Sequence, residues 1–280
     1  MKYAVLMLII FTFNLAGSAQ GEIVAFADNA GLVGGTQNGK WLTDEQVVKS
    51  IGKGSKFINF GLPEKKQKEI YGTIADLAGC GKYYFFFAQS PKTAMPAAEN
   101  VYNKSLKFNG LAISANAKWN LFPRNQVNIG TNNKTYQKIV SDFLIGKGFI
   151  KPKINLKKVV KVDIEGDGAD EIFIEATYSK NQNRDRKNWV NAGDYSFVLM
   201  RKLINGKPQD ILINGDFYPK VPAQEDYVSY YELTAIVDLN GDGKMEIAIG
   251  GLYTYGGEST EIYEISDNKL TSVLSSECGD

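Results

Sequence analysis

One nine-residue acidic pattern occurs twice in this chain, and it constrains the fold more than any other feature. The two copies are Asp163–Glu171 and Asp238–Glu246. Each has oxygen-bearing side chains at positions 1, 3 and 5, glycine at positions 4 and 6, and glutamate at position 9. Glycine at position 6 permits the positive φ of a sharp turn. Because apolar runs flank both copies, each is predicted to be a loop between two antiparallel strands.

The oxygen donors in the two loops are spaced as in a calcium site. Calcium takes six to eight oxygen ligands at about 2.3–2.6 Å, and one tight loop can supply them. An EF-hand would close with glutamate at position 12 and continue into a helix, whereas a strand-forming sequence follows position 9 here. The alternative is a pair of polar turns without metal. The candidate ligands are the side chains of Asp163, Glu165, Asp167 and Glu171 with the carbonyl of Ala169, and the side chains of Asp238, Asn240, Asp242 and Glu246 with the carbonyl of Lys244.

The sequence around each loop predicts a four-stranded antiparallel meander. Two-residue turn signals at Asn205-Gly206 and Asp267-Asn268 each separate two of these strands. A single sheet of this kind has two faces to bury, so it must stack on a neighbour. The predicted strands are residues 159–162, 172–178, 195–203 and 209–213 around the first loop, and 233–237, 247–252, 261–265 and 270–274 around the second.

These repeats resemble the FG-GAP and VCBS repeats of exported bacterial proteins and integrin-type β-propellers, over roughly residues 159–277. The family signature is Asp-x-Asp-x-Asp-Gly-x-x-Asp before an apolar strand. Both copies here end in Glu instead of Asp, and Glu165 is one methylene longer than the Asp or Asn usual at position 3. The resemblance implies calcium in the loops and a surface that binds protein or glycan. A seven-bladed propeller needs roughly 400 residues, so a small or incomplete β-propeller-like fold is expected.

The predicted fold class is therefore mainly β, with four-stranded meander repeats and an α+β N-terminal half. We expect a mixed α/β region over residues 20–135 and the β-repeat region over residues 136–280. In the first, Gly34–Trp41 predicts a hairpin that turns at Asn38-Gly39, and a capping box beginning at Thr43 predicts a short helix. A second helix is predicted over 136–144 from its apolar spacing.

The first 19 residues have the pattern of a secretory signal peptide, with cleavage near Ala19. The protein is therefore expected to be exported, either periplasmic or secreted. An oxidising compartment favours a disulfide between Cys80 and Cys278, the two cysteines of the chain. The alternative is a buried thiol at Cys80 and a loose one at Cys278.

The chain contains no histidine, which excludes Ser-His-Asp and Cys-His catalysis and histidine-bound zinc. The favoured function is a non-enzymatic, calcium-binding module with a protein or glycan ligand. The lysines of the first half are scattered, so nucleic acid is not expected as a partner. No later segment is apolar enough to predict a membrane span.

The alternative function is a glycan hydrolase that uses carboxylates. Glu258 would act as the acid, with Asp216 or Glu225 as the second carboxylate. A sugar-stacking platform of aromatic residues is also conceivable, although such residues more often pack in a core. The members considered are Trp41, Trp119, Trp189, Tyr253 and Tyr255.

Overall fold

The computed structural model describes residues 21–29, 31–62, 68–75, 84–93, 105, 110–180, 189–223, 226–253 and 256–278. Of the described residues, 52% lie in strands and 9% in helices, which confirms the predicted mainly-β class. The strands form three antiparallel sheets, and none of these is closed into a barrel within the described part. The predicted signal peptide lies outside the described residues.

The first sheet contains seven strands in the order β3-β2-β1-β7-β4-β5-β6. Its strands are β1 (Val24–Ala27), β2 (Leu32–Gln37), β3 (Lys40–Leu42), β4 (Ser55–Phe60), β5 (Lys68–Ala75), β6 (Tyr84–Ala88) and β7 (Leu111–Ser114). The helix α1 (Asp44–Val47) follows β3 and continues as a 3₁₀ turn over Val48–Ser50. The predicted capping box is present, since the Gln46 side chain accepts a hydrogen bond from the Thr43 amide at 2.9 Å.

The second and third sheets are the two predicted meanders. In the second sheet the order is β12-β11-β10-β9-β8, and in the third it is β13-β14-β15-β16. The second sheet contains β8 (Val127–Asn128), β9 (Leu156–Val162), β10 (Glu171–Tyr178), β11 (Asp194–Ile204) and β12 (Lys207–Tyr218). The third contains β13 (Ser229–Val237), β14 (Glu246–Tyr253), β15 (Glu258–Ser266) and β16 (Lys269–Cys278). The first acidic loop joins β9 to β10, and the second joins β13 to β14, as predicted.

The turn chemistry explains why these hairpins close where they do. Asn205 and Gly206 have φ of 53° and 72°, and Asp267 and Asn268 have φ of 51° and 61°. Two successive positive φ values define a type I′ turn, whose twist matches that of the flanking strands. Asn38 and Gly39 also have positive φ and form the same type of turn between β2 and β3.

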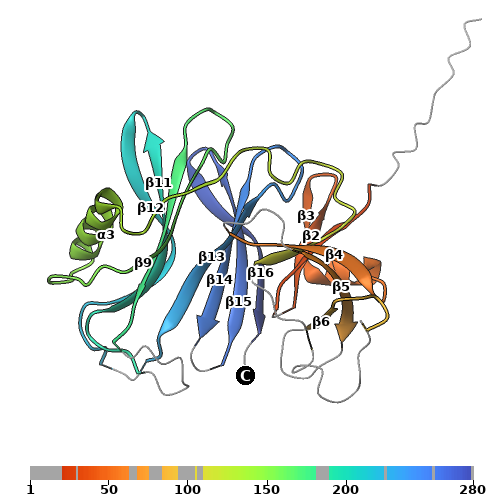
Figure 1. The fold of residues 1–280 in the computed structure, drawn as a ribbon, viewed down its shortest axis with the longest axis horizontal. Coiled ribbons are helices and arrows are strands. Elements are labelled where there is room, and N and C mark those ends of the chain that lie inside the picture. Colours follow the sequence, from red (N-terminus) through yellow and green to blue (C-terminus); the bar gives the residue numbers. More distant parts are fainter. Residues whose placement is uncertain are drawn as a thin grey trace, which may run out of the picture.

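The third sheet lies in the middle of the molecule, between the other two sheets (Figure 1). Successive side chains along each of its strands point to opposite faces of the sheet. Ile247 and Ile249 pack with Phe173 of the second sheet, while Ala248 packs with Phe26 and other residues of the first sheet. On the outer face of the second sheet lies α3 (Lys134–Gly146), which buries Val140 and Leu144 against it. Separate apolar clusters therefore cover both faces of the third sheet.

Cys278 ends β16 and is 4% exposed. No free cysteine occurs in the described part of the chain, and Cys80 lies outside it. The pairing of the two cysteines stays a prediction. Among the described residues, no helix is both long and apolar enough to span a membrane.

Candidate metal loops and central cleft

The two acidic loops lie side by side at one end of the stacked sheets. The Met245 amide in the second loop donates a hydrogen bond of 2.9 Å to the carbonyl of Ile164 in the first. Ile164 and the equivalent Leu239 are fully buried, each at position 2 of its loop. The repeat in the sequence therefore corresponds to a repeat in space, with the two loops in direct contact.

The two loops share most of their internal hydrogen bonds. The aspartate at position 1 accepts bonds from the amides at positions 4 and 6, at 2.6 and 3.0 Å in the first loop and 2.7 and 3.0 Å in the second. The glutamate at position 9 accepts a bond from the amide at position 2, at 3.0 and 2.6 Å. The position-7 amides, of Ala169 and Lys244, donate to the aspartates at position 5 at 2.9 and 2.7 Å. The backbone thus holds these carboxylates at the turn.

An extended segment, residues 115–126, crosses over both loops and is called the bridging segment here (Figure 1). Trp119 donates its indole N–H to the Asp238 carbonyl at 2.9 Å, and the Asp238 amide donates to Leu121 at 2.9 Å. Arg124 lies between the loops. Its guanidinium donates to the carbonyls of Asp163, Ile164 (2.8 Å) and Gly243 (2.5 Å). The bridging segment therefore fixes one loop relative to the other.

A lysine from the neighbouring strand reaches the first loop. Lys202 in β11 is 5% exposed, and its ammonium contacts the Glu165 carboxylate and lies 3.5 Å from Oε1 of Glu171. Burial, opposed in part by the charge of Asp163, lowers the pKa of Lys202 from its ordinary value. Two carboxylates at contact distance favour the charged ammonium. The first loop therefore has a cation of its own.

The second loop has no such partner. No lysine or arginine of the described residues forms an ion pair with Asp238, Asp242 or Glu246. Burial, followed by the charges of Asp242 and Asp238, raises the pKa of Glu246 to about 8. In the first loop, burial and the charges of Asp167 and Asp163 raise the pKa of Glu171 to about 7.

The donors of the second loop fit a hard cation chemically. Three carboxylates, the Asn240 amide oxygen and the Lys244 carbonyl make an all-oxygen set of the kind that calcium prefers. In the described part of the chain, however, no three acidic or cysteine side chains are gathered closely enough to hold a metal ion as they stand. Binding would therefore require these side chains to move inward from their hydrogen bonds with the loop amides.

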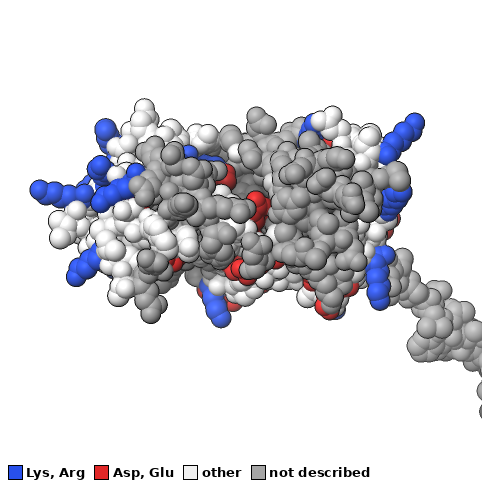
Figure 2. Space-filling view, turned by 90° about the horizontal axis from the view of Figure 1, so that it is seen from below, with Lys and Arg blue, Asp and Glu red and all other residues white. Residues whose placement is uncertain are grey.

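A cleft of about 470 Å³ lies at the opposite end of the same strands. From the loops, β10 runs down to the cleft at Thr177, and β13 begins at the cleft and runs up to the second loop. Most of the visible lysines and arginines lie towards the two ends of the molecule, and carboxylates lie in the hollow between them (Figure 2). Among the lining residues are Asp28, Glu175, Tyr178, Tyr231, Glu232 and Glu258.

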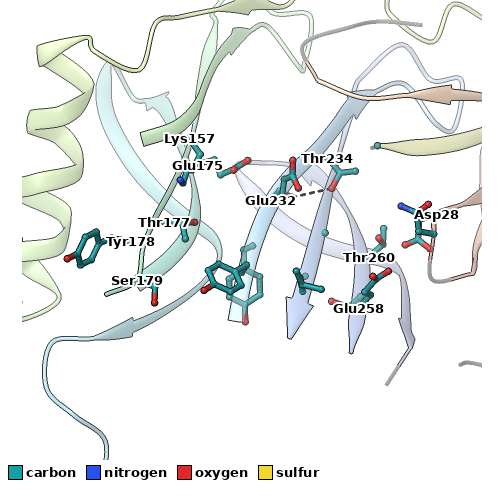
Figure 3. A pocket seen from close by; sticks show the side chains of 18 of the residues that line it. Asp28, Lys157, Glu175, Thr177, Tyr178, Ser179, Glu232, Thr234, Glu258 and Thr260 are labelled. Carbon is teal, nitrogen blue, oxygen red and sulfur yellow. Dashed lines mark hydrogen bonds between the residues drawn. The ribbon is translucent and has the colours of Figure 1, made fainter. Parts of the chain in front are cut away.

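All three sheets contribute to the cleft (Figure 3). Glu175 and Thr177 extend from β10, Glu232 and Glu258 from the third sheet, and Asp28 from the end of β1, whereas the Tyr178 ring points the other way, toward α3. Glu175 accepts a hydrogen bond from the Leu233 amide at 3.0 Å, which joins the second sheet to the third. Burial raises the pKa of Glu175. Lys158 lies 3.4 Å from Glu175 and 3.3 Å from Glu232.

The residues proposed for a hydrolase are only partly brought together. Glu258 does line the cleft, whereas Asp216 lies outside it and accepts a hydrogen bond from Tyr231 at 3.3 Å. Glu225 falls outside the described residues. The tyrosines and glutamates of β10 and β13 were not singled out in the sequence, because nothing local distinguishes them from other strand residues.

The suggested aromatic platform does not form in the described structure. Trp41 packs edge-on against Phe26, Trp119 covers the second loop, and Trp189 stacks on Tyr227 at 5.0 Å. None of the three lines the cleft. Tyr253 does not line it either, and Tyr255 lies outside the described residues.

No protein-family model, no curated protein and no solved structure matches this chain.

Proposed function

We propose that this protein is an exported, calcium-binding module of the FG-GAP/VCBS type, which binds a ligand and is not an enzyme. The observation that carries the proposal is the pair of equivalent loops, which share the hydrogen bonds of positions 1, 5 and 9 and are in direct contact. The second and third sheets would then be two neighbouring blades of an incomplete propeller-like stack. The first sheet would close the stack on its other side.

Calcium should stabilise the folded protein, because it binds the folded loop far better than the unfolded chain. With about 1 mM calcium and a Kd near 0.1 mM, linkage gives about 1.4 kcal/mol per site. For a chain of this size, that raises the melting temperature by about 3–6 °C per site. The measurement is a thermal melt with calcium, with magnesium and with chelator. Magnesium should have less effect, because it demands octahedral geometry.

The matched variants are Asp242→Ala and Lys207→Ala. Lys207 is exposed at the start of β12 and belongs to neither loop. The first should lose the calcium shift and the second should keep it. A wild-type melt that does not change between calcium and chelator would contradict the calcium function.

The ligand that fits the cleft best is a neutral or amino-group-bearing glycan. A volume of about 470 Å³ lies within the range of small-ligand sites. Tyrosine faces suit the apolar side of a sugar ring, and carboxylates accept hydrogen bonds from its hydroxyl groups. The lining carboxylates outnumber Lys157, the lining lysine, so an anionic glycan would be repelled.

We expect the mature protein to bind neutral or amino sugars, and not sulfated or uronic ones, on a panel of soluble glycans. Glu258→Gln should weaken binding by about tenfold or more, since a charge-assisted hydrogen bond is worth about 1.5–3 kcal/mol. The control is Glu277→Gln, which makes the same change on the exposed face of the adjacent β16. Equal binding by the two variants would place the ligand elsewhere.

The alternative function is hydrolysis of that glycan, because Glu258, Glu232 and Glu175 share one cleft. Incubation with the panel distinguishes the two. A hydrolase releases new reducing ends and loses this activity in Glu258→Gln, whereas a binding module releases none.

A further inference from the structure

The two loops have the same backbone but different neighbours on the adjacent strand. In the second sheet Ile172 pairs with Arg201, so Lys202 is the next residue along and faces Glu171. In the third sheet Ile247 pairs with Tyr263, so Glu264 takes the matching place beside Glu246. One loop is thus paired with a lysine and the other with a glutamate, which donates nothing to the loop and accepts a hydrogen bond from Trp41 at 3.1 Å.

We propose that the Lys202 ammonium is the resident cation of the first loop, so that the chain binds calcium in the second loop alone. This inference rests on the proposed calcium function and assigns it to one of the two loops. Lys202 contacts carboxylates at positions 3 and 9, which are two of the side chains that calcium would need. The ammonium and calcium therefore compete for the same oxygens.

The residue at position 3 supports this assignment. The first loop has Glu165 where the second has Asn240. The longer glutamate reaches Lys202, whereas Asn240 bonds to the amide of Asp242 at 2.8 Å, within its own loop. The departure of the first copy from the family pattern thus coincides with its ion pair.

Displacing Lys202 would be costly for the first loop. The side chain is 5% exposed, so an ammonium separated from its carboxylates has little access to water. Uncompensated buried charges of this kind lower a binding constant by about 100-fold or more. Calcium binding at the first loop would therefore be far weaker than at the second. In the second loop, no described basic side chain has to be displaced from the carboxylates.

The test is the number of calcium ions bound by the mature chain, freed of metal by chelator and titrated with calcium in a calorimeter. We expect one ion per chain, lost in Asp242→Ala and retained in Asp167→Ala. These two variants need no change at Lys202, so the assignment can be tested even if that residue is essential for folding. Two ions in the wild type, or one ion lost in Asp167→Ala, would overturn the inference while leaving calcium binding intact. No ion at all would overturn the proposed calcium function itself.

Removing the charge of Lys202 should allow calcium to bind in the first loop. Lys202→Met keeps the length of the side chain and removes its charge, so this variant should bind two ions, and Asp167→Ala should abolish the additional one. The matched control is Lys161→Met, because Lys161 pairs with Asp170 at 2.7 Å beside the same loop but contacts no proposed ligand. That variant should still bind one ion. A folded Lys202→Met protein that binds a single ion would overturn the role of Lys202.

Discussion

Gly241 and Gly243 have nearly the same backbone conformation, with φ of 79° and 85°, but different surroundings. A Cβ on Gly241 would lie 3.0 Å from the Trp119 ring, whereas one on Gly243 meets nothing within 4 Å. An alanine at either site is strained by the positive φ, by about 1–2 kcal/mol. At Gly241 it would also push on the indole that bonds to the Asp238 carbonyl.

We therefore expect Gly241→Ala to lose more stability than Gly243→Ala, by about 1–3 kcal/mol, the usual cost of overpacking. The measurement is urea unfolding of both variants in chelator, so that metal does not contribute. When Trp119→Leu is added to each variant, the two losses in the free energy of unfolding should become more similar. Equal losses in the single variants would mean that the bridging segment does not press on the second loop.

At the scale of elements, local sequence predicts the hairpins and meanders well. Asn205-Gly206 and Asp267-Asn268 define both turns through their positive φ, and the alternation of strands such as β14 defines the two buried faces. The first sheet is different. Its β7 lies between β1 and β4, far from both in sequence. No periodicity within β7 carries information about that pairing, so the topology of the first sheet could not be predicted.

The candidate metal loops show the same difference between local sequence signals and contacts that form only in the fold. The candidate ligands could be found from their spacing, because they lie within nine residues. Arg124 and Lys202 could not, since each reaches the first loop from a distant part of the chain. The register between β10 and β11 puts Lys202 beside Glu171, and register is a property of the folded sheet.

At the scale of the whole molecule, apolar packing crosses the expected boundary between residues 20–135 and 136–280. The first sheet buries Phe26 and Ile113 against the third sheet, and the second sheet buries Phe173 against the other face of that same sheet. If the first half unfolds, the third sheet exposes one apolar face, and if the second half unfolds, the first sheet loses the residues that cover Phe26 and Ile113.

We therefore predict one cooperative unfolding transition for the mature protein, with calorimetric and van't Hoff enthalpies that agree. Ile113→Ala in the first sheet and Phe173→Ala in the second should each cost about 2–5 kcal/mol, since both side chains are fully buried. Both should lower the midpoint of the same transition. Ile150→Ala is the control, because Ile150 is 92% exposed and its loss should leave the midpoint unchanged. Two resolved transitions, with Ile113→Ala shifting one and Phe173→Ala the other, would instead show that the halves fold independently and that the third sheet is stable with one face uncovered.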